Sequence, residues 1–379
     1  MKKILVFTTD CKGHHLEYLH HFYIQALRDE SNLYVFCVSS DFNEVKSTFS
    51  WPKAGNIIVD IIRDVDLKKC ISGKNGFFNI MKLSFFKSLY IRKKCRQYNI
   101  NTVYTIMLME YLPALPFILS KSIDFRGIIY RIALNEKSLS LKSKLIENFK
   151  FKLLAKSEIF RKVFVLNDRK SVERLNDIYG VCKFCYLPDP FPRTSMPHDL
   201  RSELHIPVVN KMFLHFGGLG LRKGTITIIE AIEKIKDTKN LTFVFAGKVG
   251  DDCRDLFYSQ IEKVKDKVQI LVYDKFCSYD FLSSLAYTAD CLLIPYQNVN
   301  QSSGVLGYAA QYDKPVIGPD AGLLGEIIRI YGLGIVISCP ITAESLAKSI
   351  TDAESIKPVD GKMYRESNSI ENFLNIITE

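Results

Sequence analysis

The chain has 379 residues, of which 47% are hydrophobic and 24% are charged, and its net charge is +10. These proportions are typical of globular proteins, and the length exceeds what one ordinary core holds, so we expect two domains. No apolar run approaches the roughly 20 residues of a membrane-spanning helix, and the run after the basic start, Ile4–Phe7, is too short for a signal peptide. We therefore expect a cytoplasmic protein.

The basic excess lies in the first half of the chain. Residues 1–190 hold 31 Lys and Arg against 18 Asp and Glu, whereas residues 191–379 hold 20 against 23. The segment 67–109 contains no acidic residue at all. This asymmetry indicates an anionic partner for the first half, such as a membrane surface or a phosphorylated substrate. Nucleic acid is not expected, because the basic half lacks the interleaved aromatic motifs that bind it.

In chain order, the first half alternates between strand-like and helix-like segments. The pattern predicts strands at 4–7, 33–38, 57–61, 102–107, 127–132 and 163–167, and helices at 16–27, 77–95 and 142–156. The last two helices are basic and amphipathic, with Phe85 and Phe149 among lysines. Lysine stems beside aromatic rings suit a membrane interface, and an ordinary solvated face is the alternative.

Five prolines between Tyr186 and Pro207 indicate a linker, after which the alternation restarts. Strands are expected at 212–216, 241–246, 268–272, 291–295 and 315–318, and helices at 225–236, 254–264, 279–289 and 303–312. The pattern predicts an α/β protein of two Rossmann-like domains facing a cleft. We place these domains at 1–187 and 208–360, the linker at 188–207, and in 361–379 a last helix that packs back on the N-terminal domain.

A glycine-rich turn follows the strand 212–216. Gly217, Gly218 and Gly220 interrupt the apolar run, and Arg222 and Lys223 come just before the next helix. Backbone N–H groups freed by glycines, a helix N-terminus and two fixed cations suit a phosphate or a diphosphate. On this stretch alone, an ordinary βα turn with solvated cations is the alternative.

A second candidate anion site follows the strand 291–295. Ser302, Ser303 and Gly304 open the next helix, where hydroxyl groups and free N–H groups can bind an anion. Two such sites in one domain predict one diphosphate between them.

With these two segments, the sequence resembles the family 4 glycosyltransferases, whose GT-B fold has two Rossmann-like domains. The turn at 217–224 matches the family's donor-phosphate loop, with Lys223 at its lysine position. Further matches are Ala289, Asp290 and Pro295 along one strand, 314–317 in the next, and Gly322 with Glu326 after it. The resemblance implies that Lys223 and Arg222 act on the leaving diphosphate, and that the donor contacts Gly217, Gly218, Lys275, Ser302, Ser303 and Gly304.

The sequence departs from the family pattern at two places. The family's paired glutamates would fall at Asn300 and Tyr308, and neither residue is acidic. The family's arginine would fall at Gly218, so that Arg222 must supply the second cation. The resemblance is therefore to a variant subgroup that lacks the paired glutamates, with Asn300 and Tyr308 expected near the donor.

The resemblance also implies acceptor-binding residues in the first domain. Gly13, His14 and His15 occupy the place of the family's glycine loop after the first strand. A histidine often found after a later strand has no counterpart here, and Glu110 is the titratable group in its place. We expect these four residues to contact the acceptor.

The function implied is transfer of a sugar, with retention, from a nucleotide-diphosphate sugar to a hydroxyl group of a glycan or a polyprenyl-diphosphate-linked acceptor. Such a reaction serves cell-surface polysaccharide or glycoconjugate synthesis, and we expect it in the cytoplasm, on the inner face of the cell membrane. The resemblance also implies that no cofactor or metal is needed, and cations and N–H donors are expected to stabilise the leaving diphosphate instead. The alternatives are a GT-B epimerase or hydrolase of sugar nucleotides, and a basic membrane-binding protein without transferase activity.

Overall fold

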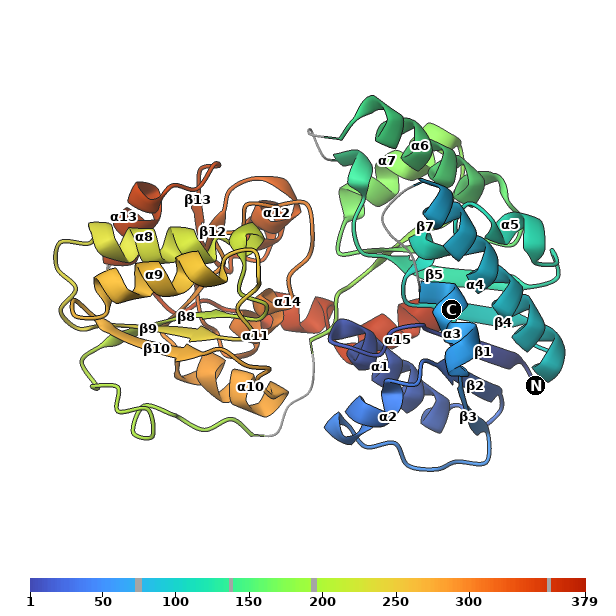
Figure 1. The fold of residues 1–379 in the computed structure, drawn as a ribbon, viewed down its shortest axis with the longest axis horizontal. Coiled ribbons are helices and arrows are strands. Elements are labelled where there is room, and N and C mark those ends of the chain that lie inside the picture. The colour runs from blue at the N-terminus through green and yellow to red at the C-terminus, as the bar shows by residue number, and fades with distance from the viewer. Residues whose placement is uncertain (72–76, 136–138, 192–195, 353–355) are drawn as a thin grey trace. The chain divides into compact units, whose positions relative to one another are not determined.

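The structure is a computed structural model that describes residues 1–71, 77–135, 139–191, 196–352 and 356–379. The chain forms two compact units (Figure 1). Unit 1 consists of Met1–Leu187 and Phe373–Glu379, and unit 2 consists of Pro188–Asn372. Each unit is a Rossmann-like α/β domain, which confirms the predicted fold class.

Unit 1 is built on a parallel sheet in the order β3-β2-β1-β4-β5-β6-β7. The strands are β1 (Lys3–Phe7), β2 (Leu33–Val38), β3 (Ile57–Ile61), β4 (Thr102–Thr105), β5 (Asp124–Ile129), β6 (Val163–Leu166) and β7 (Phe184–Leu187). Apolar runs form these strands because helices cover a parallel sheet on both faces. Strand β5 begins three residues before its predicted start, because Asp124 and Arg126 pair at 2.9 Å and so enter the strand despite their charges.

Helices cover both faces of the unit 1 sheet. On one face lies α1 (His14–Arg28), where the Tyr18 ring is 5.3 Å from the ring of Phe373 in α15 (Ile370–Thr378). The C-terminal residues 373–379 thus belong to unit 1, although unit 2 continues to Asn372. The other face shares one core with α3 (Asp64–Ile71), α4 (Phe77–Tyr98), α5 (Leu115–Ile118), α6 (Leu141–Lys156) and α7 (Arg169–Tyr179).

Two lysines of the basic helix α4 lie inside unit 1. Lys87 is buried and pairs with Glu110 at 2.5 Å, and Lys94 is buried and pairs with Asp60 at 2.6 Å. The prediction that the basic residues of this helix form a surface is therefore wrong for these two. Their partners are distant in sequence, so that the local pattern gives no sign of the pairing. Lys82, Lys93 and Arg96 are exposed as expected.

Unit 2 repeats the architecture with a parallel sheet in the order β10-β9-β8-β11-β12-β13. The strands are β8 (Lys211–Phe216), β9 (Leu241–Ala246), β10 (Gln269–Tyr273), β11 (Cys291–Leu293), β12 (Val316–Pro319) and β13 (Gly334–Ile337). One face is covered by α8 (Thr225–Lys234), α9 (Arg254–Val264) and α13 (Ala343–Thr351). The other is covered by α10 (Tyr279–Thr288), α11 (Val305–Gln311), α12 (Gly322–Ile330) and α14 (Lys362–Ser367).

The predicted linker, 188–207, forms part of unit 2. The backbone N–H of Leu200 donates to Thr288 Oγ1 at 2.9 Å, and Arg201 pairs with Asp290 at 2.6 Å. Asp189 accepts a hydrogen bond from Ser302 Oγ at 2.7 Å. Proline content indicated a break between domains, but these side-chain partners hold the described part of the segment against the second core.

Both sheets reverse their strand order at the first strand of the unit. The reversal lies between β1 and β4 in unit 1 and between β8 and β11 in unit 2. In such sheets ligands bind outside the carboxyl ends of the strands at the reversal. The loops after β8 and β11 hold most of the predicted donor residues, and the loops after β1 and β4 hold the predicted acceptor residues.

Candidate functional site

The glycine turn folds back over the end of β8. After Phe216 the chain turns through Gly217, a short 3-10 helix covers Leu221–Lys223, and Gly224 begins α8 with φ +71°. The Lys223 side chain returns over the turn and its Nζ lies 3.5 Å from the Phe216 carbonyl oxygen. A Cβ atom on Gly217 would come within 2.6 Å of this ammonium group. Glycine at 217 therefore leaves the space that the lysine occupies.

A buried histidine beneath the turn connects it to the neighbouring strand. His215 Nδ1 lies 2.8 Å from the carbonyl oxygen of Leu293, and Nε2 lies 3.0 Å from Thr225 Oγ1. Because a carbonyl can only accept, Nδ1 carries the proton and Nε2 accepts from the Thr225 hydroxyl. The same hydroxyl oxygen accepts the Gly220 N–H at 3.0 Å. One chain of hydrogen bonds thus runs from β11 through His215 to the glycine turn.

Burial keeps this histidine neutral. Loss of solvent around the ring lowers the pKa of His215 to about 3, and the Lys223 cation acts in the same direction. A neutral ring can accept from Thr225, whereas an imidazolium could not. The arrangement of the turn therefore depends on a histidine that stays neutral over the whole physiological pH range.

The loop after β9 also packs against the glycine turn. Gly247, with φ +140°, lies so close to the turn that a Cβ atom there would be 1.8 Å from the Gly217 carbonyl oxygen. Leu219 and Val249 form a bridge between the two loops. Asp274, at the end of β10, accepts the Val249 N–H at 2.8 Å and pairs with Arg254. That hydrogen bond and the arginine lower the pKa of Asp274 to about 2.

The structure brings the two predicted anion sites together. The backbone N–H of Gln297 donates to the Arg222 carbonyl oxygen at 2.9 Å, and Arg222 Nη1 donates to Gln301 Oε1 at 3.4 Å. Gly224 also lies against Pro295, where a Cβ atom would come within 2.2 Å of the proline carbonyl oxygen. The glycine turn and the segment 295–304 are therefore in direct contact within unit 2.

The predicted donor residues of the second segment occupy different environments. Ser302 donates to Asp189, and Ser303 is buried with its hydroxyl 3.2 Å from that of Tyr296. Asn300 lies beside Gly322 at the start of α12. Gly304 precedes α11 without a side-chain cap, and Lys275 is exposed just beyond β10.

Tyr308 belongs to the core rather than to the surface of the segment. It is 5% exposed, and its ring lies edge-on to Phe216 at 5.2 Å. Tyr308 therefore supports the end of β8, the strand from which the glycine turn begins.

The glycine turn carries two cations, and the carboxylate of Asp252 lies beside it. Lys223 and Arg222 make long hydrogen bonds, at 3.5 and 3.4 Å, which leave most of their N–H donors available to a ligand. Asp252 accepts the Leu221 N–H at 3.2 Å on the outer side of the turn. Over the described part of the chain, no three His, Cys, Asp or Glu side chains lie close enough together to hold a metal ion.

The predicted acceptor residues lie at the carboxyl edge of the unit 1 sheet. His14 Nδ1 lies 3.0 Å from Glu17, and His15 Nδ1 lies 3.3 Å from the Asp10 carbonyl oxygen. Gly13 begins α1 with open space around its Cα atom. Glu110 follows the adjacent strand β4, and its carboxylate is held by Lys87. The sequence did not show this lysine as part of the site.

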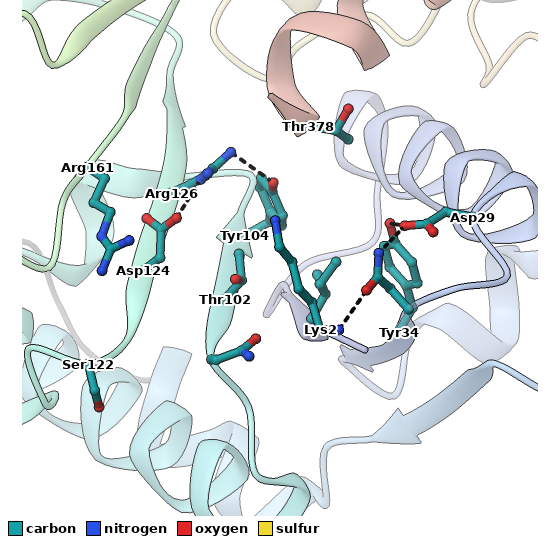
Figure 2. A pocket seen from close by; sticks show the side chains of 13 residues that line it. Lys2, Asp29, Tyr34, Thr102, Tyr104, Ser122, Asp124, Arg126, Arg161 and Thr378 are labelled. Atoms are coloured by element: carbon teal, nitrogen blue, oxygen red, sulfur yellow. Dashed lines mark hydrogen bonds and ion pairs between the residues drawn. The ribbon is translucent and has the colours of Figure 1, made fainter.

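A polar pocket of about 310 Å³ lies at the opposite edge of the unit 1 sheet, where the strands begin (Figure 2). Arg126 pairs there with Asp124 and donates to the Tyr104 hydroxyl at 3.2 Å. Asp29 accepts from the Tyr34 hydroxyl at 2.7 Å. The Arg126–Tyr104 contact joins β5 to β4, and the Asp29–Tyr34 contact joins the end of α1 to β2, so we assign the pocket a structural role.

Comparison with known protein families gives one match. Residues 198–369, which lie in unit 2 and include both loops of the site, match the family model of glycosyl transferases group 1. No curated protein sequence matches the chain.

Several solved structures share the fold. The structure of HepE from Anabaena, in complex with UDP and glucose, is 15% identical with a TM-score of 0.68, and the match covers 100% of this chain and 98% of that one. Sucrose-phosphate synthase from Thermosynechococcus elongatus is 14% identical, with a TM-score of 0.69 and coverage of 99% and 97%. WaaG, a glycosyltransferase involved in lipopolysaccharide biosynthesis, is 14% identical, with a TM-score of 0.66 and full coverage of both chains. The likeness establishes the GT-B fold.

Proposed function

We propose that the chain is a group 1 glycosyltransferase that transfers a sugar from a nucleotide-diphosphate sugar to a hydroxyl group. The observation that carries the proposal is the Lys223 ammonium group folded back over Gly217, at the edge where a Rossmann-like sheet binds its ligand. The match of unit 2 to the group 1 family model supports it. So does the likeness to HepE, which was solved with UDP and with UDP-glucose.

In this proposal unit 2 stabilises the leaving diphosphate. As the bond to the anomeric carbon breaks, negative charge develops on the phosphate oxygens and needs cations and N–H donors already in place. Lys223 and Arg222 supply the cations, while the backbone around Gly217 and Gly218 allows close approach. The chain from Leu293 through His215 to Gly220 holds the turn in position, so that little reorganisation is needed when the charge appears.

We further propose that transfer proceeds with retention and without a metal. The acceptor hydroxyl would attack from the face that the diphosphate leaves, and the departing phosphate would take its proton. Asn300, Ser302, Ser303, Gly304 and Lys275 would surround the rest of the donor. The acceptor, a glycan or a polyprenyl-diphosphate-linked sugar, would contact Gly13, His14, His15 and Glu110 of unit 1.

A panel of UDP, GDP, dTDP and CMP sugars tests the function. We expect one diphosphate donor to raise the thermal unfolding temperature, because a ligand that binds the native state alone stabilises it. The CMP sugar, which carries a single phosphate, should bind more weakly than the best diphosphate donor. Consumption of the donor without any acceptor would instead favour the epimerase or hydrolase alternative. Failure of every donor to bind would contradict the proposal.

Gly218→Ala is expected to weaken donor binding at least about tenfold without loss of stability. A Cβ atom at Gly218 meets no protein atom within 4 Å, so the folded chain accommodates it, while it would occupy the space that the phosphates need. Calorimetric titration of the donor, with thermal unfolding alongside, measures both effects. Gly55→Ala, which also places a Cβ in open space, is the matched control in unit 1. Undiminished binding by Gly218→Ala would place the phosphates elsewhere.

We also propose that the enzyme works in the cytoplasm at an anionic membrane surface, since the basic excess of the chain lies in unit 1. Among the described residues, no helix has the length and apolar character to cross a bilayer. A basic membrane-binding protein without activity is the alternative, and the donor panel separates the two.

A further inference from the structure

Exposed apolar side chains lie on two helices of the layer that covers one face of the unit 1 sheet. On α4, Phe78 is 88% exposed and shares a helical face with Met81 and Phe85. On α6, Leu141 and Leu145 are 81% and 71% exposed and share a face with Phe149. Monomeric soluble proteins rarely expose contiguous apolar surface without a binding role.

The two stripes meet at a groove between the helices. The groove has a volume of about 270 Å³, and it is lined by Ile80 and Met81 of α4, by Pro113, and by Leu145, Ile146 and Phe149 of α6. Lys150 completes the lining, with its ammonium group held by Glu147 at 2.8 Å. The walls are thus almost entirely apolar, which suits a hydrocarbon chain rather than a sugar or a nucleotide.

Every exposed charged side chain that the structure describes on α4 and α6 is basic. Lys82 on α4 and Lys142 and Lys152 on α6 are exposed. The acidic residues in the described parts of 77–156 are Glu110, Asp124 and Glu147, and each pairs with a cation of unit 1. The lysines around the groove therefore keep their charge available to a negatively charged partner.

We propose that this surface, formed by the groove and by the exposed side chains of α4 and α6 around it, docks on an anionic lipid bilayer. The apolar side chains would enter the boundary between headgroups and acyl chains, an acyl chain would fill the groove, and the lysines would contact lipid phosphates. A second copy of the chain fits less well, because it would bring the same lysines face to face. Docking would bring the proposed transferase to a lipid-linked acceptor, but docking itself requires neither donor nor acceptor.

Sedimentation of the full chain with vesicles tests the proposal. We expect binding to vesicles of phosphatidylcholine with phosphatidylglycerol, weakened by salt, and much weaker binding to phosphatidylcholine alone. The double variant Leu145→Ser with Phe149→Ser should reduce binding to the mixed vesicles about tenfold or more, since it removes apolar area that enters the lipid. The double variant Lys82→Glu with Lys142→Glu should also reduce it about tenfold or more.

Ile330→Ser, at the end of α12 in unit 2, is the matched control because Ile330 is similarly exposed. It should leave vesicle binding unchanged. Binding that survives both double variants, or wild-type protein that does not bind the anionic vesicles, overturns the proposal. A wild-type chain that dimerises without lipid, together with a monomeric Leu145→Ser/Phe149→Ser double variant, would show that the surface binds a second copy instead. Donor binding without vesicles, measured by thermal unfolding, should be unchanged in that variant, which separates a failure of docking from a failure of the proposed transferase.

Discussion

Lys223→Ala is expected to lower the rate of sugar transfer at least about a hundredfold while leaving the fold intact. Removal of one preorganised donor from a site that stabilises developing negative charge costs about two to three orders of magnitude in rate. The fold should persist because the side chain is only partly buried and makes a single long hydrogen bond, to the Phe216 carbonyl oxygen. The rate of donor consumption with acceptor present and the circular dichroism spectrum measure the two effects.

Lys239→Ala is the matched control for this variant, because Lys239 is exposed in the segment just before β9, at the opposite end of the sheet. It should consume the donor at the wild-type rate. Arg222→Ala should have a smaller effect than Lys223→Ala, since Arg222 is exposed to solvent that weakens its charge. A Lys223→Ala enzyme that retains nearly full activity would remove Lys223 from the site.

The buried histidine makes the stability of unit 2 sensitive to acid. His215 has a pKa of about 3 in the folded state, against about 6.5 in an unfolded chain. Below pH 6.5 the unfolded state therefore binds a proton that the folded state does not, so the free energy of unfolding falls as the pH is lowered towards 3. The loss should reach about 2 kcal/mol between pH 7 and pH 5 from this residue alone. Urea unfolding at the two pH values measures it.

His215→Gln removes the titrating group and should lack this additional loss, although it should be less stable than the wild type at pH 7. His198→Gln, which replaces an exposed histidine of the same unit, should keep the wild-type dependence on pH. Equal pH dependence in the wild type and His215→Gln would show that His215 is not held neutral.

Much of the fold could be predicted from the sequence because the strands are apolar runs bounded by glycine, proline or polar residues. Some short or polar elements could not be predicted, for physical reasons. The strands β7 and β13 are four-residue edge strands, so neither has a strong pattern, and α7 is a mostly polar helix whose buried residues are Ser171 and Leu175. The segment 188–207 reads as a linker because its partners, such as Asp290, lie far away in sequence.

The candidate site could be predicted in part. Glycines and cations at 217–224 mark the turn, and the contact between Gln297 and Arg222 joins it to the second predicted segment. The support beneath the turn could not be predicted, because His215 reads as one more residue of an apolar strand and Thr225 as an ordinary helix start. Gly247 is needed because the loop after β9 closely approaches the backbone of Gly217, and only the structure shows that these two loops lie together.

Calorimetric titration with a nucleoside diphosphate and the matching monophosphate tests the central claim most directly. The nucleoside is the one that the donor panel selects, and both ligands are titrated into the wild type and into Lys223→Ala. Because the glycine turn and Lys223 are proposed to hold the diphosphate, the wild type should bind the diphosphate at least about tenfold more tightly than the monophosphate. Lys223→Ala should lose most of that difference. Equal affinity of the wild type for the two ligands, or a preference that Lys223→Ala retains, would contradict the account.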